Sequence, residues 1–437
     1  MGITIGIRRE DKNEWERRAL LLPRDLVELQ REIGTTFIVQ PSPIRVVTDE
    51  EYRAAGLAVG EDLSPCDIVL AIKEIPARLL QRGKVYVYFS HVVKGQPYNM
   101  PMLRRLLELG CSLVDYEKIA DEQNRRLVFF SRHAGYAGMI ETLWCLGQRL
   151  RWRGLSTPLA EVRHAYGYAD LAAAKAHLRE IGDKILRHGL PEGLRPLVFG
   201  VAGYGNVSQG VQEILNVLPV TEVSPGELPA AAAPSDAAPP LLKVVFREED
   251  MACPTDPQAT FALQDYYARP ERYLGCFDRH LPHLDVLVNT IYWEERYPRL
   301  VTREWAQTHC LPGHRPRLQV IGDISCDIEG SIELTLKTTQ PAAPCYVYDP
   351  VEDAVQDGVE GHGPVVMAVD NLPCELALES SAHFSATLKG MVPDMAAADW
   401  SVDFARLNLP PHLKKAVIVH RGELTPAYGY LRHYIEA

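Results

Sequence analysis

Short apolar runs alternate with helix-like patterns along the first 130 residues. The runs predict strands over 3–7, 36–39, 67–72, 84–89 and 112–114, and the segments between them predict helices, one opening at Pro23 and another around 50–55. Strands that alternate with helices indicate a parallel sheet with crossover helices. A long apolar helix is expected over about 137–150, where the chain leaves this first region.

The same alternation starts again near Arg195. An apolar strand runs from Leu197 into a glycine-rich turn, an amphipathic helix follows, and later strands are predicted over 220–224, 285–289 and 318–321. A helical pattern over 372–388 and a strand over 415–420 are too short for a third domain, so we expect them to complete the first. The predicted fold class is α/β, with two Rossmann-like, doubly wound parallel-sheet domains and a cleft between them.

Domain boundaries follow from this alternation. The predicted substrate and catalytic domain comprises residues 1–136 and 371–437, and the predicted nucleotide-binding domain comprises residues 137–370. An alanine- and proline-rich segment over 229–240 is expected to be a mobile surface loop inserted in the second domain. The two predicted domains are expected to close about the segments near Ala137 and Asn371 and to exclude water from the cleft between them.

Composition and charge place the chain among globular proteins. Its 437 residues are 46% hydrophobic and 24% charged, and this length accommodates two or three domains with proper cores. A net charge of −11 disfavours nucleic acid as a partner, because no basic excess is present to neutralise phosphates. The nine cysteines show no C-x-x-C pair and no metal-binding spacing, so a reducing compartment and no metal are expected. Neither a signal peptide nor a membrane-length apolar run is seen, and we expect a cytoplasmic location without membrane contact.

The glycine-rich turn over 200–210 is the first candidate for a ligand site. A strand, a tight glycine turn and a helix N-terminus form a site for a pyrophosphate, because backbone N–H groups and the helix dipole point at the anion. The spacing of Gly203, Gly205 and Ser208 fits G-x-G-x-x-G only with serine in the third place. A tight strand–helix connection without a ligand is the alternative.

The next strand in the sequence bears on the choice of cofactor. A NAD site usually carries an acidic residue about 20 positions beyond the glycines, where it accepts a hydrogen bond from the ribose 2′-hydroxyl. Ser224 stands nearest to that place, and it neither repels nor neutralises a 2′-phosphate. Glu222, which stands earlier in the same strand, keeps the choice between NAD and NADP open.

Two titratable residues end successive predicted strands of the first domain. Lys73 follows the strand over 67–72, and His91 follows the strand over 84–89. Ligands of open parallel sheets bind at the carboxyl ends of strands, so both side chains are expected to face one crevice and to transfer protons there. Taken alone, a lysine that reaches solvent and a histidine bonded to a loop carbonyl fit the same pattern.

Other charged residues near strand ends are candidates for binding substrate. A guanidinium matches a carboxylate in shape and charge, and four arginines surround the first strand: Arg8, Arg9, Arg17 and Arg18. Surface arginines are nevertheless more common than ligand anchors. A further set flanks another strand end and, taken alone, is typical of a solvated turn; it comprises Asp115, Glu117, Arg125 and Arg126.

Several ordered sequence blocks then connect the chain to a known family. They are R-R-E-D at 8–11, W-E-R-R-A at 15–19, Y-F-S-H at 88–91, D-Y-E-K at 115–118, G-Y-A-G-M-I at 135–140, G-Y-G-N-V-S at 203–208, N-T-I-Y-W-E at 289–294, D-I-S at 323–325 and V-D-N-L-P at 369–373. Through them the sequence resembles the lysine-2-oxoglutarate reductase domain of the aminoadipic semialdehyde synthase family, also called saccharopine dehydrogenase (NADP, lysine-forming). More distantly it resembles fungal NAD-dependent saccharopine dehydrogenase and alanine dehydrogenase, within the alanine dehydrogenase/saccharopine dehydrogenase superfamily.

The resemblance implies roles for individual residues of the first domain. It matches Lys73 and His91 to the family's acid–base pair and Arg18 to an arginine that binds a substrate carboxylate. Glu117 matches a charged group near the substrate amine, and Arg126 also aligns with a site residue of the family.

The resemblance also implies a cofactor and the residues that bind it. These residues are Gly203, Gly205, Asn206, Val207, Ser208, Ser224, Ile291, Tyr292 and Asp370. The glycine turn follows the reductase form, and the reductase shares the absence of an acid at Ser224. Both features imply NADP, with NAD as the alternative cofactor.

The implied reaction is the reductive condensation of L-lysine with 2-oxoglutarate to saccharopine, using NADPH, in lysine degradation. One alternative is an NAD-linked saccharopine or alanine dehydrogenase, and another is a non-catalytic nucleotide-binding regulator or a transhydrogenase-like subunit. The sequence ends at Ala437, where bifunctional animal and plant proteins continue into a second dehydrogenase. A separate glutamate-forming saccharopine dehydrogenase is therefore expected as the pathway partner.

Overall fold

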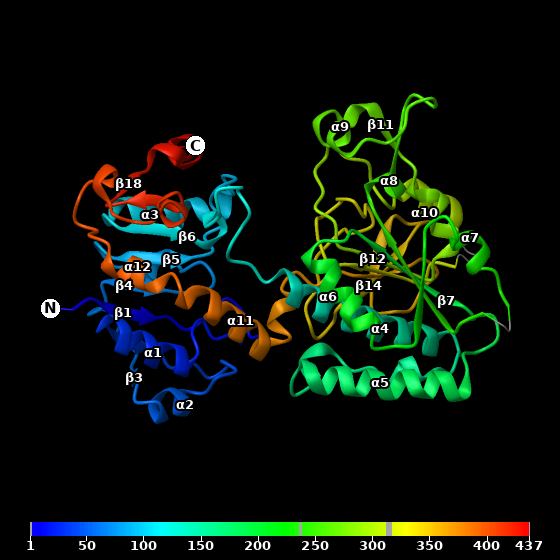
Figure 1. Cartoon of the computed structure of the whole chain (residues 1–437), viewed down its shortest axis with the longest axis horizontal. Coiled ribbons are helices and arrows are strands. Elements are labelled where there is room, and N and C mark those ends of the chain that lie inside the picture. The colour runs from blue at the N-terminus through cyan, green and yellow to red at the C-terminus, as the bar shows by residue number, and fades with distance from the viewer. Residues whose placement is uncertain (1, 236–237, 312–316, 437) are drawn as a thin grey trace. The chain divides into compact units, whose positions relative to one another are not determined.

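The chain folds into two compact α/β units, each built on one eight-stranded sheet (Figure 1). A computed structural model describes residues 2–235, 238–311 and 317–436. The first unit comprises Met1–Phe130 and Ala377–Ala437, and the second comprises Ser131–Leu376. The predicted α/β class with two sheet domains is confirmed.

The first sheet has the strand order β18-β17-β6-β5-β4-β1-β2-β3. Its strands are β1 (Thr4–Ile7), β2 (Thr36–Val39), β3 (Ala58–Val59), β4 (Ile68–Leu70), β5 (Val85–Tyr88), β6 (Ser112–Asp115), β17 (Val417–His420) and β18 (Glu423–Leu424). Strands β1 to β6 pair in parallel, whereas β17 is antiparallel to β6 and β18. The chain adds β2 and β3 on one side of β1 and then β4, β5 and β6 on the other. This reversal between β1 and β4 is where open α/β sheets bind ligands.

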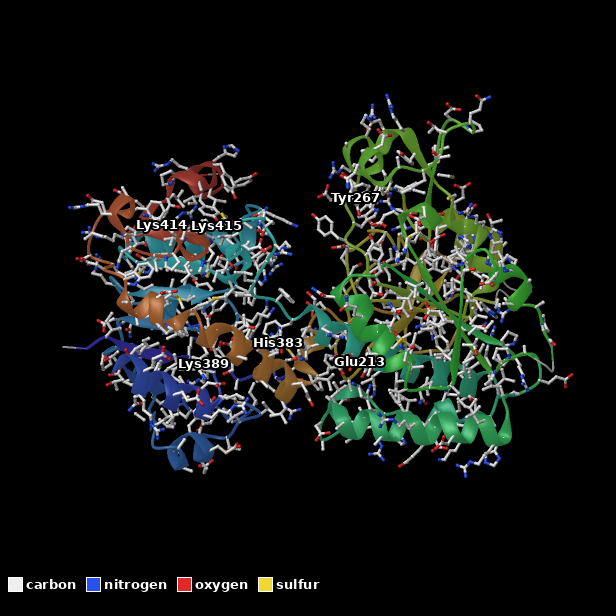
Figure 2. The ribbon with its side chains drawn as sticks, in the orientation of Figure 1. Glu213, Tyr267, His383, Lys389, Lys414 and Lys415 are labelled. Atoms are coloured by element: carbon white, nitrogen blue, oxygen red, sulfur yellow. The ribbon has the colours of Figure 1, made fainter. Side chains whose placement is uncertain are left out.

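The helices of the first unit cover this sheet and tie its two chain segments together. They are α1 (Pro23–Ile33), α2 (Asp49–Ala54), α3 (Met100–Glu108), α11 (Ala377–Lys389), α12 (Val392–Ala397), α13 (Pro411–Lys414) and α14 (Arg432–Glu436). Hydroxyl groups on α11 accept hydrogen bonds from the loop before α1: Ser381 Oγ from the Ala19 N–H (2.7 Å) and Ser385 Oγ from the Leu22 N–H (2.8 Å). Lys389 at the end of α11 pairs with Glu28 of α1 (Figure 2).

The second sheet has the strand order β15-β14-β16-β13-β12-β7-β9-β8. Its strands are β7 (Leu197–Ala202), β8 (Val220–Val223), β9 (Leu241–Phe246), β12 (Val286–Asn289), β13 (Val320–Asp323), β14 (Cys345–Asp349), β15 (Ala354–Asp357) and β16 (Val365–Met367), with β10 (Ala252–Pro254) and β11 (Tyr273–Gly275) in a separate hairpin. All pairs in the sheet are parallel except those of β14. Strand β9 therefore lies between β7 and β8, although β8 follows β7 in the sequence.

The helices of the second unit include two long ones, α4 (Ser131–Trp152) and α5 (Leu171–His188). The shorter helices are α6 (Asn206–Leu215), α7 (Leu228–Ala231), α8 (Glu248–Met251), α9 (Leu263–Ala268) and α10 (Arg303–His309). Helix α4 crosses α6 at a pair of glycines. A Cβ atom added to Gly135 would lie 2.1 Å from the Val207 carbonyl oxygen, and one added to Gly210 would lie 2.3 Å from the Arg132 carbonyl oxygen. Only glycine allows so close a crossing.

The compact units divide the chain at positions other than the predicted boundaries. The prediction separated 136 from 137 and 370 from 371, whereas the units separate Phe130 from Ser131 and Leu376 from Ala377. The reason is that α4 begins at Ser131, and its first turns carry the glycine contact with α6. These turns therefore belong to the core of the second unit.

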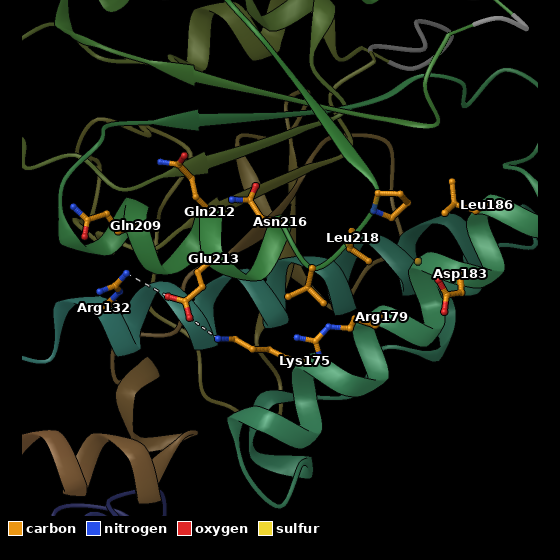
Figure 3. Close-up of a pocket in the computed structure, with 13 residues that line it drawn as sticks. Arg132, Lys175, Arg179, Asp183, Leu186, Gln209, Gln212, Glu213, Asn216 and Leu218 are labelled. Carbon is orange, nitrogen blue, oxygen red and sulfur yellow. Dashed lines mark hydrogen bonds and ion pairs between the residues drawn. The ribbon is translucent and has the colours of Figure 1, made fainter.

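Glu213 on α6 joins three helices in one charged network (Figure 3). Its carboxylate lies 2.5 Å from Lys175 Nζ of α5 and 3.3 Å from Arg132 Nη2 of α4, and it accepts a hydrogen bond from the Tyr136 hydroxyl (2.7 Å). The network lines a hollow of about 920 Å³ between α5 and α6. None of the predicted cofactor residues lines this hollow, so its size does not make it the cofactor site.

The predicted surface loop over 229–240 is wrong in its first part. Residues Leu228–Ala231 form α7, and Leu228 and Ala232 are buried in the core beside β9. Arg317 Nη1 donates to the Ala232 carbonyl oxygen (2.7 Å). A leucine and a run of alanines favour a short packed helix, which the proline content obscured. Residues 236 and 237 of the segment lie outside the described residues.

Two buried glutamates, Glu141 on α4 and Glu375 after β16, form a pair of carboxyl groups. Glu141 Oε1 accepts a hydrogen bond from the Ala165 N–H (2.6 Å), and its Oε2 lies 2.8 Å from His164 Nδ1. Burial raises the pKa of Glu141, and burial together with the charge of Glu141 raises the pKa of Glu375. Burial lowers the pKa of His164. The unit therefore folds around carboxyl groups that favour their protonated form.

The wild type is expected to lose stability as pH rises, and Glu141→Gln is expected to make this loss smaller. A carboxyl whose pKa is raised by folding stabilises most below its unfolded pKa of 4.5, and that stabilisation is lost as pH rises through the folded value. Each unit of difference between the folded and unfolded pKa changes the free energy of unfolding by about 1.4 kcal/mol. Urea unfolding at about pH 5 and about pH 7, compared between wild type and variant, measures the effect, and an unchanged difference between the two pH values would contradict it.

Candidate functional site

Lys73 and His91 stand at the ends of neighbouring parallel strands. Lys73 follows β4 and His91 follows β5. The pairing of these strands continues past their ends, because the Phe89 N–H donates to the Ile72 carbonyl oxygen (3.0 Å). The structure therefore brings the two residues of the predicted acid–base pair to one edge of the sheet, next to the reversal between β1 and β4.

Glu10 fixes the backbone that carries Lys73. One carboxylate oxygen accepts a hydrogen bond from the Ile72 N–H (2.6 Å) and the other from the Lys73 N–H (3.0 Å). Glu10 is buried, and burial and the neighbouring Glu16 raise its pKa, against the effect of the two N–H groups. Lys73 is half-buried, and no described residue forms a hydrogen bond or ion pair with its Nζ atom. Nothing in the described part of the protein therefore holds its Nζ atom in place.

His91 has an unusual backbone conformation and a carboxylate beside its ring. Its φ angle is +50°, a left-handed value that non-glycine residues rarely adopt and that is often found at functional sites. Its Nδ1 atom lies 3.4 Å from Glu74 Oε2, and Lys12 Nζ lies 2.7 Å from Glu74 Oε1. Burial raises the pKa of Glu74, but His91 and Lys12 beside the carboxylate outweigh it and hold this pKa at about 2. Glu74 is therefore a carboxylate that faces the Nδ1 side of the His91 ring.

Asp115 is buried rather than part of a solvated turn, which corrects the interpretation of that charged set. It accepts hydrogen bonds from the Ser90 hydroxyl and N–H and from the Glu117 N–H (2.8 Å). Burial raises the pKa of Asp115 to about 6, although these hydrogen bonds lower it. The carboxyl group thus joins the end of β5, next to His91, to the end of β6, next to Glu117. Glu117 is half-buried.

Arg18 is buried and already paired. Its Nε and Nη2 atoms donate to the two carboxylate oxygens of Glu16 (2.7 and 2.5 Å), and its guanidinium carbon lies 4.2 Å from the centre of the Phe130 ring. A substrate carboxylate that reaches Arg18 therefore meets a guanidinium shared with Glu16. Arg126 is exposed, with its guanidinium carbon 6.0 Å from the centre of the Phe89 ring.

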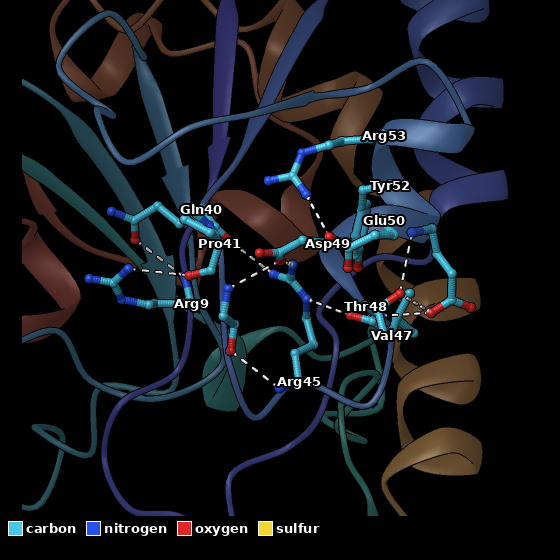
Figure 4. Close-up of polar contacts among 12 residues, drawn as sticks. Arg9, Gln40, Pro41, Arg45, Val47, Thr48, Asp49, Glu50, Tyr52 and Arg53 are labelled. Carbon is cyan, nitrogen blue, oxygen red and sulfur yellow. Dashed lines mark hydrogen bonds and ion pairs between the residues drawn. The ribbon is translucent and has the colours of Figure 1, made fainter.

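Other arginines of the first unit serve the fold. Arg8 pairs with Asp11 (2.7 Å). Arg9 binds the Glu61 carboxylate and the Pro41 carbonyl oxygen (3.2 Å). Arg45 donates to the Gln40 and Val47 carbonyl oxygens and to Asp49 (2.6 Å), and it lies over the Tyr52 ring (Figure 4). The contacts of Arg45 hold α2 and the loop before it, and those of Arg8 and Arg9 join residues of the same unit.

The glycine turn of the second unit opens into a cavity of about 490 Å³. Six of the predicted cofactor residues line this cavity: Gly203, Gly205, Asn206, Val207, Ile291 and Tyr292. Gly203 has φ +98°, and a Cβ atom there would lie 2.9 Å from Thr290 Oγ1, whereas a Cβ atom on Gly205 would meet nothing within 4 Å. Helix α6 starts directly after Gly205, so its first N–H groups point into an open cradle. These features fit the pyrophosphate of a dinucleotide.

The other three predicted cofactor residues do not line the cavity. Ser208 is buried and its hydroxyl accepts a hydrogen bond from Gln212 Nε2 (3.0 Å). Ser224 ends the edge strand β8, where its hydroxyl and N–H donate to Glu227. Asp370 is exposed in the segment that follows β16.

Sequence reasoning missed an aromatic wall of this cavity. Its members share an aromatic ring and come from the glycine turn, from α9 and from the segment after β12: Tyr204, Tyr266, Tyr267, Trp293 and Tyr297. The adjacent pairs Y-Y at 266–267 and Y-W at 292–293 were the available signal.

Within the described residues, no group of His, Cys, Asp and Glu side chains has the arrangement of a metal site, and no helix is long and apolar enough to cross a membrane.

Comparison with known proteins shows which proteins this chain resembles. Residues 6–137 match the family model "Alanine dehydrogenase/PNT, N-terminal domain". Over 98% of its length the chain is 38% identical to α-aminoadipic semialdehyde synthase of Arabidopsis thaliana and 35% identical to the mitochondrial α-aminoadipic semialdehyde synthase of Bos taurus. Over nearly its whole length, the chain resembles the aminoadipic semialdehyde synthases.

The predicted resemblance to the aminoadipic semialdehyde synthases is confirmed. The chain spans less than half the length of those two relatives, 41% of the plant protein and 47% of the bovine one. Saccharopine dehydrogenase [NAD(+), L-lysine-forming] of Neurospora crassa is 26% identical over 88% of this chain and 89% of the fungal protein. These relatives support a nicotinamide-dependent oxidoreductase.

Two solved structures share the fold. An L-alanine dehydrogenase superposes with a TM-score of 0.62 at 16% identity, covering 99% of this chain and 100% of that chain. A transhydrogenase from Sinorhizobium meliloti superposes with a TM-score of 0.57 at 14% identity, covering 97% of this chain and all of the other. The two-sheet architecture is therefore that of alanine dehydrogenase.

Proposed function

We propose that the chain catalyses the NADPH-dependent reductive condensation of L-lysine with 2-oxoglutarate to saccharopine. The observation that carries this proposal is the similarity to the aminoadipic semialdehyde synthases over 98% of the chain. The sequence resemblance matches Lys73 and His91 to the family's acid–base pair, and these residues stand at adjacent strand ends with Glu10 and Glu74 beside them. The roles assigned below to individual residues are part of the proposal.

The cofactor lies on the glycine turn of the second unit. Gly203 and Gly205 give the pyrophosphate room, and the first N–H groups of α6 donate to it. When bound, NADPH supplies the hydride that reduces the imine carbon. The aromatic wall beside the turn keeps water from that part of the dinucleotide.

Lys73 and His91 move the protons of the condensation. The ε-ammonium group of the substrate lysine must lose a proton before the lone pair of the resulting amine attacks the ketone carbon of 2-oxoglutarate. The resulting carbinolamine then expels its hydroxyl as water, which requires a proton donor. Lys73 Nζ and His91 Nε2 are the groups that accept and donate these protons, and Glu74 holds the His91 ring by its Nδ1 side.

Charged side chains of the first unit orient the substrates. Arg18 and Arg126 bind carboxylates, with Glu16 fixing the direction in which the Arg18 guanidinium points. Glu117, whose N–H is held by Asp115, attracts the cationic amine of lysine. Substrates held in this way react in an effectively unimolecular step.

The experiment that tests the proposal is an assay of NADPH oxidation with each substrate omitted in turn. Oxidation is expected only when lysine and 2-oxoglutarate are both present. Pyruvate in place of 2-oxoglutarate and NADH in place of NADPH are expected to support much lower rates. No lysine-dependent oxidation would refute the assignment.

The second candidate is an NAD-linked saccharopine dehydrogenase, which the similarity to the Neurospora crassa protein favours. Faster turnover with NADH than with NADPH would select it, and ammonia-dependent reduction of pyruvate would select an alanine dehydrogenase. NADPH binding without turnover of any substrate pair would select the regulator.

Two further expectations belong to the proposal. A glutamate-forming saccharopine dehydrogenase consumes the product. A cytoplasmic location also stays a prediction, since the bovine relative is named as mitochondrial. Fractionation of cells that express the chain tests the location.

A further inference from the structure

The order of strands in the second sheet changes which residue stands beside the adenosine end of the dinucleotide. Strand β9, not β8, pairs with β7, and Ala202 is the register partner of Phe246. The Gly203 N–H donates to the Phe246 carbonyl oxygen (3.0 Å). Arg247 is therefore the first residue beyond the strand next to the glycine turn. In dinucleotide-binding folds, the residue at that place contacts the adenosine ribose.

We infer that Arg247, supported by Tyr204, binds the 2′-phosphate of NADP and makes the site selective for it. This inference rests on the proposed use of a dinucleotide by the glycine turn. It replaces Ser224, which ends the edge strand β8 with the whole of β9 between it and β7.

The position of the Arg247 side chain supports this role. Its guanidinium carbon lies 4.9 Å from the centre of the Tyr204 ring, and Tyr204 is part of the glycine turn itself. Its backbone N–H donates to Asp250 Oδ2 (2.8 Å), which fixes the start of α8. Arg247 is exposed, and its guanidinium forms an ion pair with none of the carboxylates among the described residues. A planar guanidinium held on an aromatic ring at the turn can donate two hydrogen bonds to a phosphate.

The neighbouring acid is engaged elsewhere. Glu248 lines the cavity and is the group that would accept a hydrogen bond from the free 2′-hydroxyl of NAD. Its Oε1 atom already accepts a hydrogen bond from the Tyr267 hydroxyl (2.6 Å) on α9 (Figure 2). The geometry thus offers the 2′ position a guanidinium that no described carboxylate neutralises and an acid that is hydrogen-bonded to a tyrosine.

Fragments of the cofactor test this inference without any turnover. Isothermal titration calorimetry of the full chain compares 2′,5′-ADP, which carries the 2′-phosphate, with 5′-AMP, which lacks it. The wild type is expected to bind 2′,5′-ADP at least about 10-fold more tightly. Arg247→Ala should weaken binding of 2′,5′-ADP about 10- to 100-fold and leave 5′-AMP within about 2-fold.

Two further variants sharpen the test. Arg272→Ala removes another exposed arginine of the same unit and should leave both affinities unchanged. Glu248→Gln should also keep the preference for 2′,5′-ADP. Equal affinities of the wild type for the two fragments would overturn the inference, as would equal losses for both fragments in Arg247→Ala or a lost preference in Glu248→Gln.

The result is separable from that of the proposed reaction. The fragments contain no nicotinamide and need neither lysine nor 2-oxoglutarate. A preference that depends on Arg247, found without lysine-dependent oxidation, would refute the reaction and keep the inference. NADPH-dependent condensation by an Arg247→Ala variant with unchanged fragment binding would do the reverse.

Discussion

Lys73→Met is expected to lower kcat by about 10²- to 10⁴-fold, the usual contribution of a general acid or base. Methionine matches lysine in length, and its backbone N–H still binds Glu10, so the strand end keeps its position. The substitution removes the Nζ atom, which forms no hydrogen bond or ion pair with a described residue. Steady-state kinetics and NADPH titration measure kcat and cofactor affinity separately, and the affinity should change less than about 2-fold.

A lysine on the same unit provides the matched control for this variant. Lys94 is exposed and lies shortly after His91. Lys94→Met should leave kcat within about 2-fold, because a lost surface charge changes little beyond its own hydration. An unchanged kcat in Lys73→Met would remove Lys73 from the mechanism. Equal losses in the two variants would show that net charge, not the strand-end position, matters.

Gly135→Ala is expected to destabilise the second unit by about 2–3 kcal/mol, even though alanine favours helices over glycine. The added methyl group would lie 2.1 Å from the Val207 carbonyl oxygen, so α4 and α6 must move apart. Val207 also lines the cofactor cavity, and the displacement should weaken NADPH binding. Hydrogen exchange read by mass spectrometry localises the loss, which should concentrate in α4 and α6.

Gly167→Ala is the corresponding control. Its added methyl group would have one neighbour, Arg163 Cβ at 3.8 Å, which is ordinary van der Waals contact. Stability and NADPH affinity should therefore stay close to those of the wild type. Wild-type protection of α4 and α6 in Gly135→Ala would contradict the close crossing of these helices.

Hydrophobic periodicity predicted most strands of the first sheet and half of those of the second, because buried parallel strands are short apolar runs with clear ends; it missed β9, β14, β15 and β16. The strand predicted over 36–39 coincides with β2, and the pattern at Pro23 marks the start of α1. Periodicity does not report which strands become neighbours. For that reason the sequence placed the ribose contact at Ser224, while the sheet places β9 and Arg247 beside the turn.

The candidate sites were predictable where chemistry follows from strand ends. Lys73 and His91 were found because both directly follow apolar runs. Glu10 and Glu74 were not, since their roles depend on contacts across the sheet and within a loop. The Glu16 pair of Arg18 and the burial of Asp115 were likewise invisible, because a charged residue shows nothing of its partners or its exposure in a single sequence.

The measurement that tests the central claim most directly is identification of the product. The chain is incubated with ε-¹⁵N-lysine, 2-oxoglutarate and NADPH deuterated at the transferable position, and the product is analysed by mass spectrometry and NMR. The account predicts saccharopine, with ¹⁵N in its secondary amine and deuterium on the adjacent carbon derived from the ketone of 2-oxoglutarate. Deuterated NADPH that stays unconsumed, or deuterium found in a product without the lysine nitrogen, would contradict it.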